Sequence, residues 1–142
     1  MSVVQTIRRW IHPEPVCITQ EIGREGEEAA RRFLEKSGLT FLCANYRGHR
    51  GEIDLIFKGE GILIFIEVKS RTSNSWTRPA AAVDAGKRRR ISKTALEYLR
   101  QCRNPEVSLR FDVVEVLTVD RKITEVRHIE DAFGLASPYR YG

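Results

Sequence analysis

Two apolar stretches, residues 51–57 and 62–69, constrain the fold more than any other part of this 142-residue chain. Both are short and rich in Ile, Leu, Val and Phe, which is typical of buried β-strands. The four residues between them, Lys-Gly-Glu-Gly, predict a tight turn. The sequence therefore predicts a β-hairpin at the centre of the fold.

Charged residues interrupt both predicted strands at positions where an unpaired charge is costly. Asp54 lies inside the first apolar run, and Glu67 and Lys69 follow five consecutive apolar residues in the second. Because side chains alternate between the faces of a strand, Glu67 and Lys69 project from one face, about 6.6–6.8 Å apart. Pairing of the two strands would bring the carboxylate of Asp54 beside that of Glu67.

A divalent cation shared by Asp54 and Glu67 is one explanation of these charges. Two close carboxylates repel unless positive charge lies between them, and Mg²⁺ commonly binds one or two carboxylates together with phosphate and water. A lysine beside such a metal can orient a water or stabilise developing charge. The alternative is a surface ion pair between Lys69 and a carboxylate, which would contribute little. Because both carboxylates lie in one hairpin, we favour the metal site.

Residues 21–37 predict an amphipathic helix whose apolar residues have helical spacing. Gly23 and Gly26 are unfavourable inside a helix and indicate close backbone packing or a frayed first turn. Glu27 borders the apolar stripe, so its carboxylate either reaches towards the acidic residues of the hairpin or pairs with Arg31 on the solvent face. The sequence leaves these two interpretations open.

A second helix is predicted within residues 80–101, and its first turns are strongly basic. Cations at a helix N-terminus oppose the macrodipole, which a negatively charged partner would explain. The alternative is a solvated basic face. Because the basic cluster follows the candidate metal site, we predict that it binds nucleic-acid phosphates together with Arg71. The residues of this cluster are Lys87, Arg88, Arg89 and Arg90.

Further strands are predicted at residues 39–46, 109–119 and 123–129, followed by an irregular tail from Glu130. Strands and helices in this order predict an α/β fold with a mixed central sheet flanked by helices. Residues 1–20 are predicted to be an N-terminal extension that precedes a domain over residues 21–142.

Composition limits the functional classes. The net charge of +5, from 24 Lys and Arg against 19 Asp and Glu, permits a nucleic-acid partner without proving one. No apolar run reaches the ~18–20 residues of a membrane span, and no secretory segment is recognisable. Cys17, Cys43 and Cys102 lack C-x-x-C spacing, which favours free thiols in a reducing cytoplasm. We therefore expect a cytoplasmic protein without a membrane partner.

The order of a helix with Glu27, a strand with Asp54 and a strand with Glu67-x-Lys69 resembles the restriction-endonuclease-like superfamily. More closely, the chain is similar to the YraN-like family of uncharacterised proteins, which in turn resemble archaeal Holliday-junction resolvases. The resemblance covers about residues 21–133. Its motifs are Gly23–Glu27, Asn45–Arg47, Gly51–Ile56 and Phe65–Arg71, with Lys87 and the basic helix.

This resemblance implies that Glu27, Asp54 and Glu67 are metal-site residues and that Lys69 is the catalytic lysine. The cofactor would be Mg²⁺ or Mn²⁺, and the activity would be that of an endonuclease hydrolysing phosphodiester bonds in DNA, including branched or damaged DNA. A homodimer is compatible with it, since resolvase-like relatives act on two strands. Because a fold does not fix a function, a non-catalytic nucleic-acid-binding module and a scaffold with a purely structural acidic cluster are alternatives.

Overall fold

The computed structural model describes residues 25–72 and 83–142, so the predicted extension over residues 1–20 lies outside the described part. Within these residues, five strands form one sheet in the order β1-β2-β3-β4-β5, and two helices flank it. This arrangement confirms the predicted α/β class with a mixed sheet. The elements are α2 (Glu25–Lys36), β1 (Thr40–Arg47), β2 (Glu52–Gly59), β3 (Ile62–Thr72), α3 (Ala85–Gln101), β4 (Ser108–Val119) and β5 (Lys122–Phe133).

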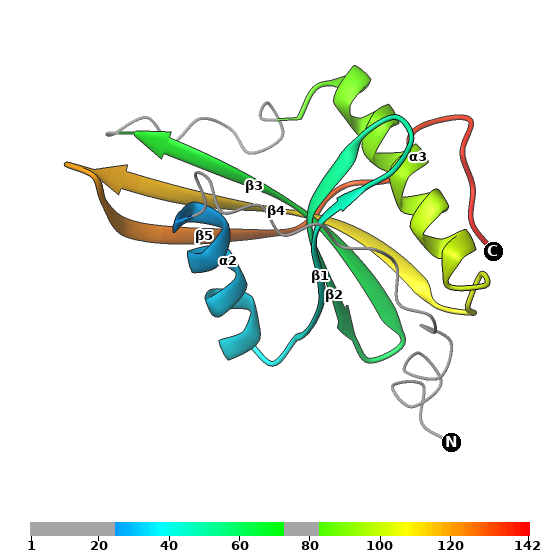
Figure 1. Ribbon diagram of the computed structural model, residues 1–142, viewed down its shortest axis with the longest axis horizontal. Coiled ribbons are helices and arrows are strands. Elements are labelled where there is room, and N and C mark those ends of the chain that lie inside the picture. Colours follow the sequence, from blue (N-terminus) through cyan, green and yellow to red (C-terminus); the bar gives the residue numbers. More distant parts are fainter. Residues whose placement is uncertain (1–24, 73–82) are drawn as a thin grey trace.

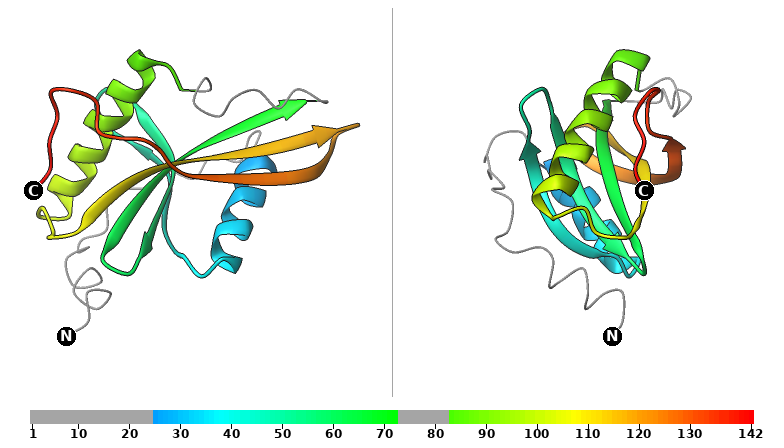
Figure 2. Two further views of the ribbon diagram at one scale, coloured as in Figure 1. Left: turned by 180° about the vertical axis from the view of Figure 1, so that it is seen from behind. Right: turned by 90° about the vertical axis from the view of Figure 1, so that its right-hand side faces the viewer.

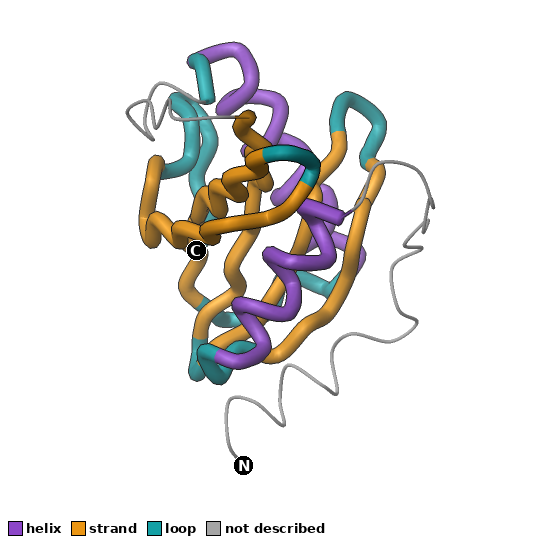
Figure 3. Tube along the Cα trace, turned by 90° about the vertical axis from the view of Figure 1, so that its left-hand side faces the viewer, coloured by secondary structure: helices purple, strands orange, loops and turns teal. Residues whose placement is uncertain are grey.

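Strand β3 is the centre of the sheet. It pairs antiparallel with β2, as the predicted hairpin requires, and parallel with β4, which the chain reaches through α3. Strands β1 and β5 complete the sheet by antiparallel pairing with β2 and β4. A strand covered on both faces must be apolar on both, which explains the uninterrupted run from Leu63 to Ile66, all buried. The sheet is strongly twisted, so that β1 and β2 cross the other strands steeply (Figures 1 and 3).

The two helices cover opposite faces of the sheet (Figures 1 and 2). On the α3 face, Leu63 and Phe65 of β3 pack with residues such as Ala95 of the helix. On the α2 face, Ile64 and Ile66 pack with Leu34. By alternation, Glu67 and Lys69 continue the α3 face of β3 beyond its apolar part.

The end of β5 differs from the prediction of an irregular tail from Glu130, because the strand continues to Phe133. The reason is a buried polar network on β4 that the sequence pattern does not reveal. Asp112 is 0% exposed and accepts hydrogen bonds from His128 Nε2 at 2.7 Å and from the backbone N–H of Asp131 at 2.9 Å. These bonds hold the bulged end of β5 against the sheet.

Two further expectations have an outcome in the described residues. Cys102 is a free, buried thiol as predicted, whereas Cys43 is disulfide-bonded, which corrects the prediction for that residue. Neither α2 nor α3 is long and apolar enough to cross a membrane.

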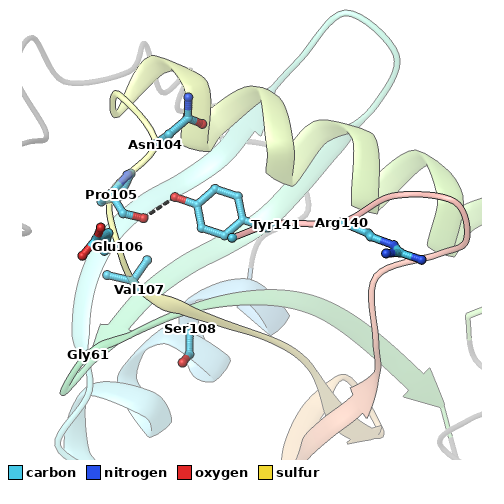
Figure 4. Close-up of a pocket in the computed structure, with 9 residues that line it drawn as sticks. Gly61, Asn104, Pro105, Glu106, Val107, Ser108, Arg140 and Tyr141 are labelled. Carbon is cyan, nitrogen blue, oxygen red and sulfur yellow. Dashed lines mark hydrogen bonds between the residues drawn. The ribbon is translucent and has the colours of Figure 1, made fainter.

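The C-terminal tail, residues 134–142, runs back along α3 (Figures 1 and 2). At its end, the hydroxyl of Tyr141 donates a hydrogen bond to the carbonyl of Pro105 (Figure 4). A cavity of about 740 Å³ lies here, beside Gly61 at the start of β3. Glu67 is in the middle of β3, and the lining of this cavity contains none of the predicted site residues.

Candidate metal and phosphate site

Strands β2 and β3 separate at Asp54. Their backbone pairing begins at the turn and its last pair is Leu55 with Ile66. Beyond that pair, Asp54 Oδ2 accepts a hydrogen bond from the backbone N–H of Val68 at 2.8 Å. We call this point the fork. At the fork a side-chain carboxylate, rather than the backbone of β2, holds the two strands together.

Glu67 lies beside the fork and is 7% exposed. Its Oε1 contacts Lys87 Nζ of α3 and lies 3.7 Å from Lys69 Nζ. The side chains of Lys69 and Lys87 are only 25% and 33% exposed. The ion pair considered from the sequence therefore exists, but it is mostly buried and part of a cluster of two amines on one carboxylate.

The carboxylates of this cluster influence one another. The pKa of Asp54 is raised to about 7, mainly by burial and then by the negative charges of Glu67 and Glu27, against the opposing effects of the hydrogen bond from Val68 and the charge of Lys87. The pKa of Asp54 is thus high because its carboxylate is buried beside other carboxylates. Such a carboxylate can accept an additional cation.

The pKa values of Lys69 and Lys87 are shifted in opposite directions. Burial and the neighbouring Lys87 lower the pKa of Lys69. Burial also opposes the charge of Lys87, but hydrogen bonds with Glu67 and Lys69 outweigh it and raise the pKa of Lys87. Lys87 is therefore the amine that holds its proton more tightly, and Lys69 the one that gives it up more readily.

Helix α2 brings Glu27 to the other side of the fork. A Cβ at Gly26 would lie 2.6 Å from Ser70 Oγ, so this glycine lets the first turn of α2 pack directly on β3. Close packing is thus the correct interpretation of Gly26. Arg31 forms its ion pair with Glu35 at 2.7 Å, and the charge of Glu27 acts on Asp54. Both observations favour the interpretation that Glu27 faces the acidic residues of the hairpin.

Acidic groups of the protein itself partly compensate the unfavourable positive charge in the first turn of α3. Asp84 is the N-cap, and its carboxylate accepts the backbone N–H of Lys87 at 2.8 Å. The side chain of Lys87 reaches Glu67. Part of the charge that the sequence assigned to nucleic-acid binding is therefore neutralised within the protein.

The other predicted phosphate-binding residues have different environments. Arg88 donates from Nε to the carbonyl of Val83 at 2.9 Å, and its guanidinium lies 5.4 Å from the ring centroid of Phe133. Arg89 and Arg90 are exposed. Arg71 follows Lys69 on the same face of β3, and its buried Nε has no hydrogen-bond partner among the described residues. The structure thus leaves Arg71, Arg89 and Arg90 as the better placed contacts for an external anion.

Glu115 of β4 was not singled out from the sequence. It is 0% exposed, and neither carboxylate oxygen has a hydrogen-bond partner among the described residues. Lys69 is its register partner on β3, so both side chains lie on the α3 face of the sheet. The signal that identified Asp54, a charge inside an apolar run, was also present at Glu115.

Comparison with known proteins places the chain in a family. Residues 26–116 match the uncharacterised protein family UPF0102. This chain belongs to the UPF0102 family. A UPF0102 protein of Coxiella burnetii is 44% identical over 112 residues, which cover 78% of this chain and 92% of the relative. UPF0102 proteins of Desulfosudis oleivorans and Clostridium beijerinckii are 42% and 40% identical over 113 and 119 residues. These matches cover 80% and 83% of this chain, and 92% and 97% of the relatives.

The UPF0102 match confirms the resemblance to the YraN-like family. It extends from the first turn of α2 into β4 and so includes every residue of the cluster at the fork. The family is uncharacterised, so the chemistry of the site has to be argued from its own residues. Those residues are Glu27, Asp54, Glu67, Lys69, Lys87 and Glu115.

Proposed function

We propose that this UPF0102 protein is a metal-dependent nuclease that hydrolyses phosphodiester bonds in DNA. One observation carries the proposal: Asp54 and Glu67 converge at the fork, and Lys69 and Lys87 lie beside them. Buried acids beside amines, at the edge of an apolar core, are costly for stability and suit a charged substrate. The resemblance to the restriction-endonuclease-like superfamily supports the same assignment.

A hard divalent cation fits these donors. Asp54 is a buried carboxylate whose pKa is raised by burial and by the neighbouring Glu67, and carboxylate oxygens suit Mg²⁺ and Mn²⁺. No group of three His, Cys, Asp or Glu side chains within residues 25–72 and 83–142 is arranged to hold a metal ion. The fit is therefore to a cation held by Asp54 and Glu67, with Glu27 nearby, and completed by phosphate oxygens and water, as is common for Mg²⁺.

The residues around the cation would have different roles in hydrolysis. A bound metal would lower the pKa of a water molecule and neutralise charge on the attacked phosphate. Lys69, whose Nζ lies 3.7 Å from Glu67 Oε1, is suited to orient that water or to stabilise charge that develops on the phosphate. Lys87 keeps its positive charge and fixes the orientation of Glu67. Arg71, on the same face of β3 as Lys69, supplies a positive charge for a substrate phosphate.

Cleavage assays test this proposal. Labelled duplex, single-stranded and four-way DNA are incubated with the protein and Mn²⁺ or Mg²⁺. We expect metal-dependent cleavage that falls by about 10²-fold or more in Asp54→Ala and Glu67→Ala. Glu52→Ala is the matched control, because Glu52 is on the same strand but its side chain is 49% exposed and pairs with Arg47. Absence of cleavage on every substrate, or cleavage that survives Asp54→Ala, would refute the mechanism.

A non-catalytic nucleic-acid-binding module is the second candidate. The observation that favours it is the contact between Lys87 and Glu67, because an ammonium already neutralises the carboxylate that a metal would use. This candidate predicts salt-sensitive binding that weakens on loss of Arg89 and Arg90 but is indifferent to Glu67→Ala. Failure to bind nucleic acid even at low salt would instead favour a scaffold. Analytical ultracentrifugation tests whether the protein forms the homodimer with which the resemblance is compatible.

A further inference from the structure

A second candidate site lies on α3, away from the fork. A cavity of about 370 Å³ is enclosed by the loop between β1 and β2, the outer side of α3 and the C-terminal tail. Its lining includes three cationic side chains, Arg50, Lys93 and Arg100, and one aromatic ring, Tyr139. This volume lies in the range of small-ligand sites.

The single acidic side chain of the cavity is already engaged. Glu97 accepts the backbone N–H of His49 at 2.9 Å and contacts the imidazole through its other carboxylate oxygen. Both oxygens are therefore directed to the loop rather than to the cations. The cavity keeps an excess of positive charge that an anionic ligand would complement.

The walls of the cavity are held in place by the protein itself. Gly48 N–H donates to the carbonyl of Gly51 at 2.8 Å, and a Cβ at Gly48 would meet the side chain of Glu97, so the loop lies flush on α3. On the opposite wall, the backbone N–H of Ala136 donates to Ser92 Oγ of α3 at 2.9 Å. These bonds fix Tyr139 beside the helix, where Lys93 Nζ lies 5.8 Å from its ring centroid.

A cationic stripe on α3 leads into the cavity. Arg89, Lys93 and Arg100 are separated by four and seven residues, a spacing that places them on one face of α3. Lys87, which contacts Glu67, precedes Arg89 by two residues and therefore lies on nearly the opposite side of the helix. Since a helix rises 1.5 Å per residue, the distance along α3 from Lys87 to Arg100 is about 20 Å. A nucleic-acid strand lying along the face with Arg89, Lys93 and Arg100 would meet one cation after another.

We propose that this cavity binds a single-stranded nucleic-acid segment, with phosphates on Lys93, Arg100 and Arg50 and a base stacked on Tyr139. The inference rests on the proposed function, because it assigns the nuclease a substrate that carries an unpaired strand in addition to the cleaved bond. The bases of a duplex are paired with the opposite strand and stacked on one another, so they cannot reach a ring in a cavity, whereas an unpaired base can. Cations alone would not distinguish the two forms of DNA, so Tyr139 decides the preference.

The test measures binding of labelled single-stranded DNA and of the same sequence as a duplex by fluorescence anisotropy, in EDTA so that cleavage cannot occur. Tyr139→Leu should weaken single-strand binding at least about fivefold and leave duplex binding within about twofold, whereas Tyr139→Phe keeps the ring and should bind as wild type. The double variant Lys93→Gln, Arg100→Gln should reduce the salt dependence of log K for the single strand by about 1.4, which corresponds to two phosphate contacts. The control is Arg121→Gln with Lys122→Gln, exposed residues of the β4–β5 turn.

Equal losses on duplex and single strand in Tyr139→Leu, or a control variant as weak as the cavity variant, would overturn the inference. Its failure is separable from failure of the proposed function, because binding in EDTA requires no metal and no Asp54. A protein that never cleaves but shows the Tyr139-dependent preference would support the cavity. Cleavage that depends on Asp54 without such a preference would support the nuclease and refute the cavity.

Discussion

Replacing Asp54 by Asn should stabilise the protein, and should do so only above a certain pH. The pKa of Asp54 is raised from 3.8 to about 7, first by burial and then by the charge of Glu67. One pKa unit corresponds to about 1.4 kcal/mol, so the ionised carboxylate destabilises the folded state by about 4 kcal/mol above pH 7. Well below pH 3.8 the group is protonated in both the folded and the unfolded chain, and the cost disappears; at pH 4 it is already below about 1 kcal/mol. The free energy of unfolding therefore falls as the pH rises from about 4 to about 7, because the folded protein has to ionise a carboxylate that is more stable in its protonated form.

Asp54→Asn removes the charge and keeps an oxygen that can accept the N–H of Val68. Urea denaturation in EDTA, followed by circular dichroism at pH 4, 6 and 8, measures the free energy of unfolding of wild type and variant. We expect the variant to be more stable by up to about 4 kcal/mol at pH 8 and to lie within about 1 kcal/mol of wild type at pH 4. Other titrating groups are common to both proteins and cancel in the difference.

Glu52→Gln is the control for loss of a carboxylate on the same strand, and should show no such pH dependence because Glu52 is half exposed. Saturating Mn²⁺ should stabilise wild type at pH 8, by about 2.7 kcal/mol at a hundredfold excess over Kd, and should not stabilise Asp54→Asn. If the difference between wild type and Asp54→Asn is the same at pH 4 and pH 8, the fork does not hold Asp54 in the environment described here.

Three further substitutions test the charges around the sheet. Lys87→Met should tighten Mn²⁺ binding about tenfold in calorimetric titrations, because no ammonium then competes for Glu67; weaker binding would contradict the competition. Asp112→Ala should lower the free energy of unfolding by about 3–5 kcal/mol, because the carboxylate of Asp112 accepts hydrogen bonds from both Arg110 Nε and His128 Nε2, and these largely buried groups would lose that partner. A loss near zero would show that the network is dispensable. Glu115→Met should stabilise the fold by about 1–3 kcal/mol, since it replaces a buried carboxylate that has no hydrogen-bond partner among the described residues; destabilisation would reveal a partner for that carboxylate.

Local patterns were sufficient to predict most elements of this fold. The hairpin of β2 and β3 followed from two apolar runs and a glycine turn, and the joint orientation of Glu67 and Lys69 followed from the alternation of side chains along a strand. The continuation of β5 to Phe133 was not predicted, because it depends on a bond to Asp112 on the neighbouring strand. A bond between residues far apart in the chain has no local pattern.

The same division applies to the candidate site. The sequence by itself determined which acids interrupt the apolar strands, because strand periodicity is a property of consecutive residues. Only the tertiary structure decided that Lys87 turns from the solvent to Glu67, and that Glu115 lies beside Lys69. The parallel pairing of β3 with β4 and the position of α3 above these strands determine those neighbours. Strand pairing and helix position both depend on packing between segments that are distant in the chain, so the order of residues within one segment does not reveal them.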